Sequence, residues 1–406
     1  MIYGSKKTLH WFWLKIHTYL FKKEQFFYTC PGSPYSFSMC VADLIKEKIR
    51  ATGPLSFRDF MEAALYTPHQ GYYCSSKNRI GKNGDFYTSP HFTPLFGEMI
   101  ARQMEEMWRL TGGNEFSIVE FGGGNGRLCL DILEYLKDNY ELYKGLHYYI
   151  IEKSIQPEKI PFYHDKVSWL PDSDSLQNIS GCVLSNELVD NLSVHRVQME
   201  ESLQEIFVDY FNNEFVEVCK NDDGVLQDYL SQLNVQLSAG YHTEINLDAL
   251  DWIRETARIL KKGFVLTIDY GYTNREFYHY QQGNLNCYYQ HTRNTNPYIH
   301  VGDQDITAHI NFSALYHWGL KYGLDYSGFT TQQYFLRSLG IAHHIQQMER
   351  KGRAYCSNEG EMLNLSYRFL TGMSSKLNVL IQNKGINKQL QCLQFNSAPE
   401  ELLCCN

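Results

Sequence analysis

A glycine turn between an apolar stretch and an amphipathic pattern constrains the fold of this chain more than any other feature. Residues 118–133 read IVEFGGGNGRLCLDIL, with four glycines within five positions. The apolar residues before the turn predict a buried strand, and the spacing of those after it predicts a helix that begins at Arg127. Such a turn lets the backbone approach a ligand closely and leaves the N–H groups of the helix start facing it. We therefore expect the turn to hold a ligand.

Strands and helices alternate along much of the remaining chain. The expected strands span residues 116–121, 147–152, 181–186, 264–269 and 377–383, and the expected helices between them span residues 127–140 and 247–260. This alternation predicts an α/β fold with a parallel sheet and helices on both faces, which places ligands at the carboxyl ends of the strands. Residues 193–241 differ, because three of their segments alternate polar and apolar residues, which predicts an antiparallel β insertion.

The segments that flank this core have their own patterns. Apolar residues at helical spacing predict an N-terminal helical region over residues 39–115, which would cover the active site. We expect the core to span residues 116–385 and a C-terminal tail to span residues 386–406. Residues 1–38 are aromatic and apolar but are interrupted by Lys15 and His17, so they are too short and too broken for a membrane span and are expected to be an extension outside the fold.

Composition excludes some classes of protein. The formal net charge of −8 provides no basic surface for a nucleic-acid backbone, so a nucleic-acid partner is not expected. The eleven cysteines are odd in number and irregularly spaced, which favours reduced thiols in a cytoplasmic protein over a disulfide framework. The cysteines and histidines show no metal-ligand spacing, so no metal is expected.

Three kinds of ligand compete for the glycine turn. A phosphate loop needs Gly-Lys-Ser/Thr at the start of the helix, but Gly126 is followed by Arg127 and Leu128, so this class is excluded. A dinucleotide needs G-x-G-x-x-G/A, and the third small position falls on Arg127 or Cys129, which disfavours a nicotinamide-dependent oxidoreductase. A turn that serves only tight packing is a further alternative.

S-adenosylmethionine fits the turn best. The pattern E-x-G-x-G-x-G is met by Glu120, Gly122, Gly124 and Gly126, and Glu152 ends the following strand. This cofactor carries no phosphates, so the turn need only admit its aminoacyl group and ribose. Glu152 can then accept hydrogen bonds from the two ribose hydroxyls. The sequence therefore predicts that these five residues bind the cofactor.

The strand expected at residues 181–186 leads into the segment SNELVDN. Asn186, Glu187 and Asp190 therefore lie at the carboxyl edge of the sheet, where a methyl group would be delivered. We expect Asn186 to contact the cofactor. A helix cap followed by surface acids is the alternative interpretation, since Asn and Asp are common in such turns.

The chain also resembles a known family. Segments across roughly residues 50–342 are similar to the MidA-like family of class I S-adenosylmethionine-dependent methyltransferases, which includes a mitochondrial complex I assembly factor that dimethylates arginine. The resemblance is carried by GPLSFRDFMEAALYTPHQGYY, IGKNGDFYTSPHFTPLFGEMIA, IVEFGGGNGRL, SNELVDNLSVHR, LTIDYG, GNLNCYYQH and GDQDITAHINFSAL. It implies a Rossmann-like sheet, S-adenosylmethionine as the cofactor and a protein arginine as the acceptor.

Further expectations follow from the resemblance. It implies a link to respiratory complex I assembly and, in a eukaryote, a mitochondrial location; a homodimer is also expected as one state. Asp85, in the family segment GKNGDFYTSP, is expected to contact the cofactor, and Asp305 and His309 are expected to line the site. A structural, hydrogen-bonded histidine is the alternative interpretation of His309, because a lone histidine is more often structural than a catalytic base. The alternative function is a non-catalytic assembly or scaffold protein that keeps the cofactor-binding fold.

An arginine acceptor asks for carboxylates, because its guanidinium is always protonated and binds planar partners through paired hydrogen bonds. Glu187 is expected to hold the guanidinium and to take its proton, with Asp190 as the second choice. The family pattern has two aromatic residues where this chain has Leu188 and Val189. This change either reshapes the acceptor pocket or alters only its packing.

Overall fold

The computed structural model describes residues 39–75, 77, 79, 84–85, 88–154, 165–279, 283–352, 366, 368 and 371–393. The chain divides into two units, Met1–Met39 and Cys40–Asn406, and the second unit contains the fold. The extension expected at residues 1–38 and the end of the expected tail, residues 394–406, lie outside the described residues.

The main sheet of the second unit has eight strands among the described residues. Its order is β15-β16-β10-β5-β2-β3-β4, and β14 pairs with the end of β10. The five strands from β10 to β4 run parallel, whereas β16 is antiparallel to β10. The predicted α/β fold with a Rossmann-like sheet is therefore confirmed. In chain order the strands span Phe116–Phe121 (β2), Leu146–Ile151 (β3), Val167–Leu170 (β4), Ile179–Asn186 (β5), Leu260–Tyr272 (β10), Ile310–Asn311 (β14), Asp325–Thr331 (β15) and Leu377–Lys384 (β16).

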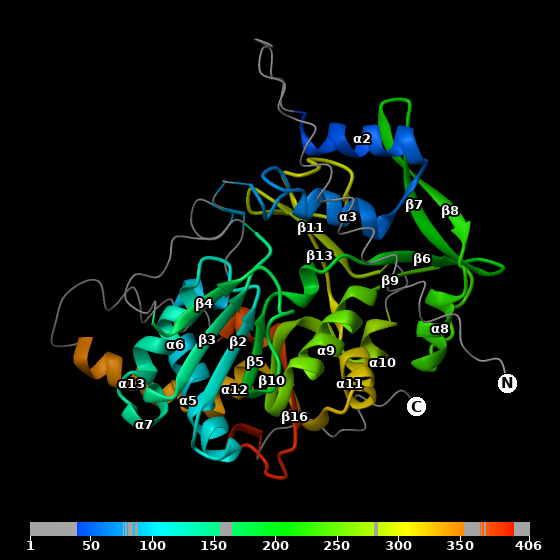
Figure 1. Ribbon diagram of the computed structural model, residues 1–406. Coiled ribbons are helices and arrows are strands. Elements are labelled where there is room, and N and C mark those ends of the chain that lie inside the picture. The colour runs from blue at the N-terminus through cyan, green and yellow to red at the C-terminus, as the bar shows by residue number, and fades with distance from the viewer. Residues whose placement is uncertain are drawn as a thin grey trace. The chain divides into compact units, whose positions relative to one another are not determined.

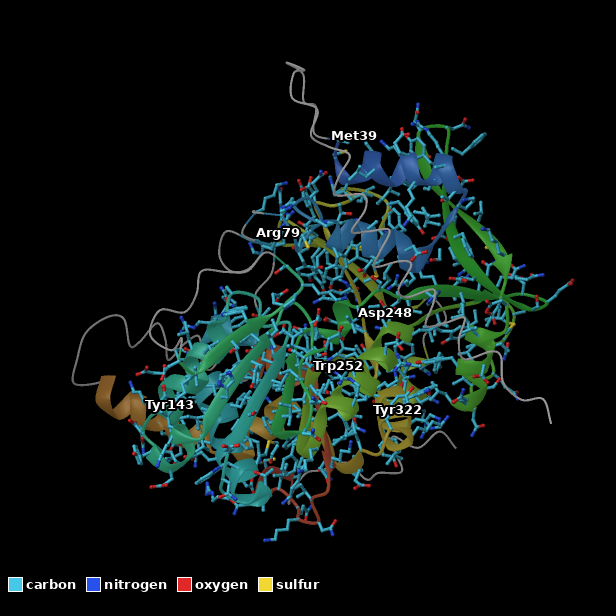
Figure 2. All side chains as sticks on the ribbon, in the orientation of Figure 1. Met39, Arg79, Tyr143, Asp248, Trp252 and Tyr322 are labelled. Carbon is cyan, nitrogen blue, oxygen red and sulfur yellow. The ribbon has the colours of Figure 1, made fainter. Side chains whose placement is uncertain are left out.

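Helices cover both faces of this sheet (Figure 1). Neighbouring residues of one strand face opposite ways, so Ile118 packs in one core and Val119 in the other. The parallel strands are therefore apolar at nearly every position. Tyr143 packs on the first face and Tyr322 on the second (Figure 2). The first face is covered by α5 (Leu95–Thr111), α6 (Arg127–Leu136), α7 (Tyr140–Lys144), α12 (Gln332–Ser338) and α13 (Ile341–Gly352), and the second by α8 (Val225–Gln232), α9 (Leu247–Ile259) and α11 (Phe312–Lys321).

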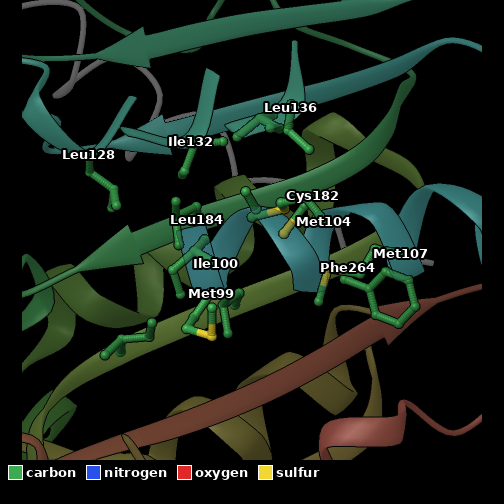
Figure 3. Close-up of a cluster of buried hydrophobic side chains, with 14 of the residues drawn as sticks. Met99, Ile100, Met104, Met107, Leu128, Ile132, Leu136, Cys182, Leu184 and Phe264 are labelled. Carbon is green, nitrogen blue, oxygen red and sulfur yellow. The ribbon is translucent and has the colours of Figure 1, made fainter. Parts of the chain in front are cut away.

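The methionine-rich helix α5 forms much of the first core. Met99, Met104 and Met107 are fully buried in one cluster with residues of α6 and with the strand residues Cys182 and Phe264 (Figure 3). Unbranched methionine side chains fill the irregular gaps between a helix and a twisted sheet. The apolar stripe of α5 is therefore core packing.

Two smaller sheets and the N-terminal helices complete the unit (Figure 1). The order β1-β7-β6-β9, with β8 on β7, is antiparallel throughout, which confirms the predicted β insertion. A third core joins this sheet to α2, α3 and β13. The bounds are Val41–Thr52 (α2), Leu55–Ser56 (β1), Phe57–Tyr66 (α3), Ser89–Phe92 (α4), His195–Met199 (β6), Leu203–Phe211 (β7), Glu214–Asn221 (β8), Tyr241–Ile245 (β9), Asn274–Phe277 (α10), Leu285–Tyr289 (β11), Thr292–Asn294 (β12) and Asp305–Ala308 (β13).

The helix expected over residues 127–140 is two helices in the structure. The first ends at Leu136, and Asn139 then caps α7, because its side chain accepts a hydrogen bond from the Leu142 N–H at 3.3 Å. An asparagine that bonds to the backbone two or three residues on favours such a restart. The prediction of one continuous helix was therefore wrong.

Other elements have no clear sequence signal. Strand β4 has only four residues, all half-buried, inside a polar stretch. Helix α8 interrupts the β insertion, and its apolar pattern is short because the helix has only eight residues. The start of the segment expected as a C-terminal tail packs with the first core, where Ile386, Leu390 and Leu393 are buried. This part of the segment includes the short 3-10 helix η3, Gln391–Leu393.

Candidate active site

A cavity of about 830 Å³ lies at the carboxyl ends of the parallel strands β2 to β5. Its lining comes from the glycine turn, from the residues that follow β3, β4 and β5, and from α3, α9 and the loop after α3. Figure 2 labels three lining residues, Arg79 of this loop and Asp248 and Trp252 of α9. Ligand pockets commonly have volumes of roughly 300–1,000 Å³, so the cavity can admit a cofactor together with a side chain of a second substrate.

The glycine turn has a left-handed backbone at three positions. Gly122, Gly124 and Gly126 have φ angles of +70°, +56° and +76°. A Cβ atom on Gly122 would lie 2.6 Å from Leu188 Cδ1, whereas a Cβ atom on Gly124 would meet no atom within 4 Å. Tight packing therefore explains Gly122. It does not explain Gly124, which borders open space in the cavity.

Glu152 follows β3 and reaches the glycine turn. Its Oε2 accepts a hydrogen bond from the Gly124 N–H at 2.8 Å, and its Oε1 accepts one from the Ser154 N–H at 2.9 Å. Each carboxylate oxygen can accept more than one hydrogen bond, so both oxygens keep capacity for hydroxyl donors of a ligand. The structure thus brings Glu152 and the turn together at the cavity.

Glu120 lies beneath the turn and is 3% exposed. Its Oε2 accepts a hydrogen bond from the Tyr148 hydroxyl at 2.7 Å. Burial raises the pKa of Glu120 to about 7, although the bond from Tyr148 acts in the opposite direction. Glu120 also lines the cavity, so it is a carboxyl group that can change charge near neutral pH at the base of the site.

Glu187 lies after β5 with a left-handed backbone, at a φ of +52°. Its N–H donates to the Ile268 carbonyl of β10 at 2.9 Å. Its Oε1 accepts hydrogen bonds from the Ser89 N–H at 2.8 Å and from Asn186 Nδ2 at 3.2 Å. Burial raises the pKa of Glu187 to about 7, while the bonds from Ser89 lower it. A non-glycine residue in this conformation is uncommon, and here it holds a carboxylate on the cavity wall.

Two buried amide oxygens at the cavity, Asn186 Oδ1 and Asn191 Oδ1, have no hydrogen-bond partner among the described residues. Asn186 Nδ2 donates to Glu187 Oε1, and Asn191 Nδ2 donates to the Glu187 carbonyl, each at 3.2 Å. The two Glu187 oxygens fix the orientation of both amides, because the reverse orientation would place each amide oxygen against a Glu187 oxygen. Buried acceptors usually have partners, so both oxygens are suited to donors of a ligand.

Asp190 is buried and does not line the cavity. It is next to Asp269, whose Oδ2 accepts hydrogen bonds from the N–H groups of Leu188, Val189 and Asp190 at 3.2, 2.8 and 3.3 Å. Asp269 therefore holds the short helix η1, Val189–Asn191. Burial and the charge of Asp269 raise the pKa of Asp190 well above its usual value, and burial raises that of Asp269 to about 6. This geometry gives Asp190 no direct contact with a ligand in the cavity.

Asp85 is buried away from the cavity lining. It accepts hydrogen bonds from the Tyr72 hydroxyl at 2.8 Å and from the Gln290 N–H at 2.6 Å. Its Oδ2 also lies 3.7 Å from Nη1 of Arg79, which does line the cavity. The direct cofactor contact expected of Asp85 has no support in this placement, and its route to the cavity is through Arg79.

Asp305 and His309 are also absent from the cavity wall. Asp305 accepts a hydrogen bond from the hydroxyl of Tyr73, a lining residue, at 2.8 Å, and burial raises the pKa of Asp305 to about 7. Burial lowers the pKa of His309 to about 4, so this imidazole is neutral near pH 7, and its ring lies against Tyr270 and Tyr272. Asp305 thus acts on the cavity through Tyr73, whereas His309 is a packed ring.

The two positions that differ from the family's aromatic pattern have separate effects. Val189 is fully buried in the second core. Leu188 lines the cavity and packs against Gly122. The change at residue 189 therefore alters packing, and the change at residue 188 alters the cavity wall.

Several residues of the site escape the sequence patterns. Asp269 ends the segment FVLTID, and the rule that selects carboxyl ends of strands would have found it. Asp172 lines the cavity after β4, a strand that the sequence does not predict. Arg58 of α3 donates to both carboxylate oxygens of Asp248 on α9, at 3.2 and 2.8 Å. No local pattern could indicate this pair, because its members are 190 positions apart.

The described part of the chain shows neither a metal-binding cluster nor a membrane-spanning helix. Across the described residues, no three His, Cys, Asp or Glu side chains gather in a way that could hold a metal ion. Within those residues, no helix is long and apolar enough to cross a membrane.

The fold and the cavity together define a class of protein. A parallel sheet with one reversed strand, a glycine turn closed by an acid from the next strand, and a cavity above them are features of a Rossmann-like methyltransferase that uses S-adenosylmethionine. The residues fit this cofactor. Glu152 offers free acceptor capacity, Gly124 borders open space, and Asn186 Oδ1 lacks a partner among the described residues.

A family described as "Putative S-adenosyl-L-methionine-dependent methyltransferase" matches residues 99–330, more than half of the chain. The chain belongs to this family, that of the MidA-like methyltransferases, and its cofactor is S-adenosylmethionine. A crystal structure of a superfamily member from Burkholderia thailandensis bound to S-adenosyl-homocysteine is similar, with a TM-score of 0.79 and 26% sequence identity, over 89% of this chain and 96% of that one.

Curated relatives are similar over most of this chain. The mitochondrial protein arginine methyltransferase NDUFAF7 homolog of Drosophila melanogaster is 24% identical over 369 residues, which cover 82% of this chain and 81% of that protein. The mitochondrial protein arginine methyltransferase NDUFAF7 of Mus musculus is 27% identical over 339 residues, 72% of each chain.

Proposed function

We propose that this chain transfers methyl groups from S-adenosylmethionine to a side-chain nitrogen of arginine in a protein substrate. The observation that carries the proposal is Glu187, a carboxylate held on the cavity wall by Ser89 and Asn186 and close to Asn191, whose Oδ1 has no hydrogen-bond partner among the described residues. Such a site suits a planar cation that offers several N–H donors. The fly and mouse relatives are named as protein arginine methyltransferases, which supports the same acceptor.

In this proposal the glycine-turn end of the cavity binds the cofactor. Glu152 accepts hydrogen bonds from hydroxyl groups, and Gly124 leaves room for the ligand beside the backbone. Asp85 keeps an indirect role through Arg79. The residues proposed to bind the cofactor are Glu120, Gly122, Gly124, Gly126, Glu152 and Asn186.

The chemistry needs a held acceptor and a place for one proton. When bound, the cofactor supplies an electrophilic methyl group, so that as the new N–C bond forms the S–C bond breaks and its electron pair stays on sulfur. Glu187 holds the guanidinium in line and accepts the proton that the methylated nitrogen loses, then releases it to water. Burial raises the pKa of Glu187 to about 7, which suits a group that must take and release a proton near neutral pH.

Asp190 has a different proposed role. Its side chain lies beside Asp269, whose carboxylate binds the N–H groups of Leu188, Val189 and Asp190 and so positions η1, which carries Asn191 to the cavity. The cellular location and the partners of the protein form a separate part of the proposal. We infer a mitochondrial location from the named location of both relatives. A link to complex I assembly and a homodimer stay predictions.

Labelling tests the function directly. Purified protein is incubated with cofactor labelled with tritium in its methyl group and with a mitochondrial extract from cells that lack this chain. We expect label in a discrete protein band, and methylarginine after acid hydrolysis of that band. Label in another amino acid would contradict the arginine acceptor. Binding of S-adenosyl-homocysteine without any transfer would favour the scaffold function.

A further inference from the structure

Two tyrosines of the N-terminal region form part of the cavity wall. Tyr66 closes α3, Tyr73 lies in the loop after α3, and both line the cavity. Their rings are stacked, with centroids 5.6 Å apart and an interplanar angle of 23°. Both rings are half-buried, so each keeps some surface toward the cavity.

Hydrogen bonds from both hydroxyls hold the rings in place. The Tyr66 hydroxyl donates to the Asn191 carbonyl at 3.0 Å, and the Tyr73 hydroxyl donates to Asp305 Oδ1 at 2.8 Å. The edge of Tyr73 also packs against Tyr72, with centroids 5.0 Å apart and planes at 87°. These contacts fix the orientation of the aromatic wall, defined as Tyr66 and Tyr73.

Several carboxyl groups surround this wall. The carboxyl groups of Glu62, Asp305, Glu152 and Asp190 all act electrostatically on Tyr66. A cation of the chain is already drawn to the ring, since Lys153 Nζ lies 5.8 Å from the Tyr66 centroid. Ring faces and carboxylates both favour positive charge.

We propose that the aromatic wall selects the acceptor, by taking the flat face of a guanidinium while Asn191 Oδ1 and Glu187 meet its N–H edge. This inference rests on the proposed function and deepens it by naming the groups that choose the substrate. A planar cation satisfies both parts of this arrangement. An ammonium has charge without a flat face, and a urea has a flat face without charge.

The SNELVDN segment contributes no aromatic side chain to the cavity. Leu188 lines the cavity and Val189 lies in the core, so this segment brings no ring to the acceptor. The rings come instead from the N-terminal region, through α3 and the loop that follows it.

The test uses the full chain loaded with S-adenosyl-homocysteine and three small probes, ethylguanidinium, n-propylammonium and ethylurea, titrated by calorimetry. We expect ethylguanidinium to bind most tightly. Tyr66→Leu should weaken ethylguanidinium by about 3- to 30-fold and leave ethylurea nearly unchanged. Tyr66→Phe should keep the preference because it keeps the ring. Tyr140→Leu, at a tyrosine that is 69% exposed, is the matched control and should change nothing.

A second variant keeps the proposal falsifiable if Tyr66→Leu does not fold. Lys153→Met removes the cation beside the ring at an exposed position, so ethylguanidinium should bind more tightly. Equal affinities for the three probes, or no change in either variant, would overturn the aromatic wall as the selector.

One further outcome distinguishes the acceptor cation from the sulfonium of the cofactor, and another tests the proposed function itself. If Tyr66→Leu weakens S-adenosylmethionine but not S-adenosyl-homocysteine, the wall faces the sulfonium of the cofactor and the proposal is wrong. If neither cofactor form binds the parent protein, the proposed function itself fails.

Discussion

The two ends of the cavity use different parts of the chain for their polar contacts. At the glycine-turn end, the Gly124 N–H donates to Glu152, and both residues belong to one strand-turn-helix-strand unit. At the acceptor end, Tyr66 comes from α3, Ser89 from α4, and Glu187 from the segment after β5. The first end is local in sequence, whereas the second is assembled from distant segments.

This difference separates cofactor binding from acceptor chemistry. Backbone shape and one carboxylate govern the glycine-turn end, so changes of side chain at the acceptor end should leave cofactor affinity intact. The two ends are still in contact, because Leu188 packs against Gly122. Variants that affect only one end sharpen the comparison, and variants that affect both would break it.

The largest effect is expected at the acceptor end. Glu187→Gln keeps the size of the side chain and removes its negative charge, so methyl transfer should fall by roughly 10²–10⁴, the range for a lost acid–base group. Affinity for S-adenosyl-homocysteine, measured by calorimetry, should stay within about twofold, because Glu187 is not needed by the glycine-turn end.

Glu201→Gln is the matched control, since Glu201 is exposed and lies outside the cavity lining. If Glu187→Gln lowered cofactor affinity and spared transfer, Glu187 would be a cofactor ligand. The two ends would then not be separate.

The next effect is expected at the glycine turn. Gly124→Val places a branched side chain in the open space beside the turn, so affinity for S-adenosyl-homocysteine should fall by at least about 100-fold. Gly323→Val is the matched control, because Gly323 also has a positive φ, +84°, and open space around its Cβ position but lies outside the cavity. Equal losses in both variants would mean that backbone strain, and not occupied space, causes the effect.

Glu152→Ala should have a smaller effect at the same end. Loss of the hydrogen bonds to ligand hydroxyls should weaken cofactor binding by about 1–3 kcal/mol. Transfer rates measured over a range of cofactor concentrations, at saturating acceptor, separate the affinity for the cofactor from the rate of methyl transfer. The rate with bound cofactor should change little, and a large fall in that rate would place Glu152 in the acceptor chemistry.

The pH dependence of transfer should follow Glu187. Its pKa is raised to about 7 by burial, and only the ionised form can take a proton. At saturating cofactor, the rate should therefore rise about tenfold per pH unit below this value and level off above it. Arginine does not titrate in this range, so it adds no second limb. Glu187→Gln should abolish the rise, whereas a flat profile in the parent protein would remove Glu187 as the base.

The last effect concerns stability at the glycine-turn end. Burial raises the pKa of Glu120 from 4.5 to about 7 on folding, so the native state binds more protons than the unfolded state in that window. Stability contributed by this group is therefore lost as pH rises through the window. Glu120→Gln should match the parent near pH 4.5 and exceed its unfolding free energy by about 1–3 kcal/mol above pH 7.

Urea unfolding at pH 5 and pH 8 measures this difference. A difference that does not change with pH would show that Glu120 stays neutral in the fold. The pH profile of transfer should remain that of Glu187, since the two carboxyl groups have different hydrogen-bond partners, Tyr148 for Glu120 and Ser89 for Glu187.

Much of the cofactor end could be predicted from the sequence. Strand β2 matches the expected residues 116–121, and the three left-handed glycines are those of the E-x-G-x-G-x-G pattern. Glu152 was expected at the end of the next strand, and there it contacts Gly124. Glycine turns and strand ends are short-range features, so a local pattern suffices to find them.

The acceptor end was only partly predictable. Glu187 and Asn186 could be selected because they follow a strand, and the structure places both on the cavity wall. The same rule selected Asp190, yet this side chain is buried beside Asp269. Which face of a short turn points to the cavity depends on what packs behind it, and the sequence pattern holds no such information.

The sequence by itself determined the α/β sheet, the glycine turn and the acid that closes it, because strand and helix periodicity and the backbone freedom of glycine are properties of neighbouring residues. Only the tertiary structure decided that Asp269 binds the Asp190 N–H across 79 positions and that Tyr73 binds Asp305 across 232. These pairings follow from burial, since a polar group removed from water must find a partner wherever the fold brings one within reach.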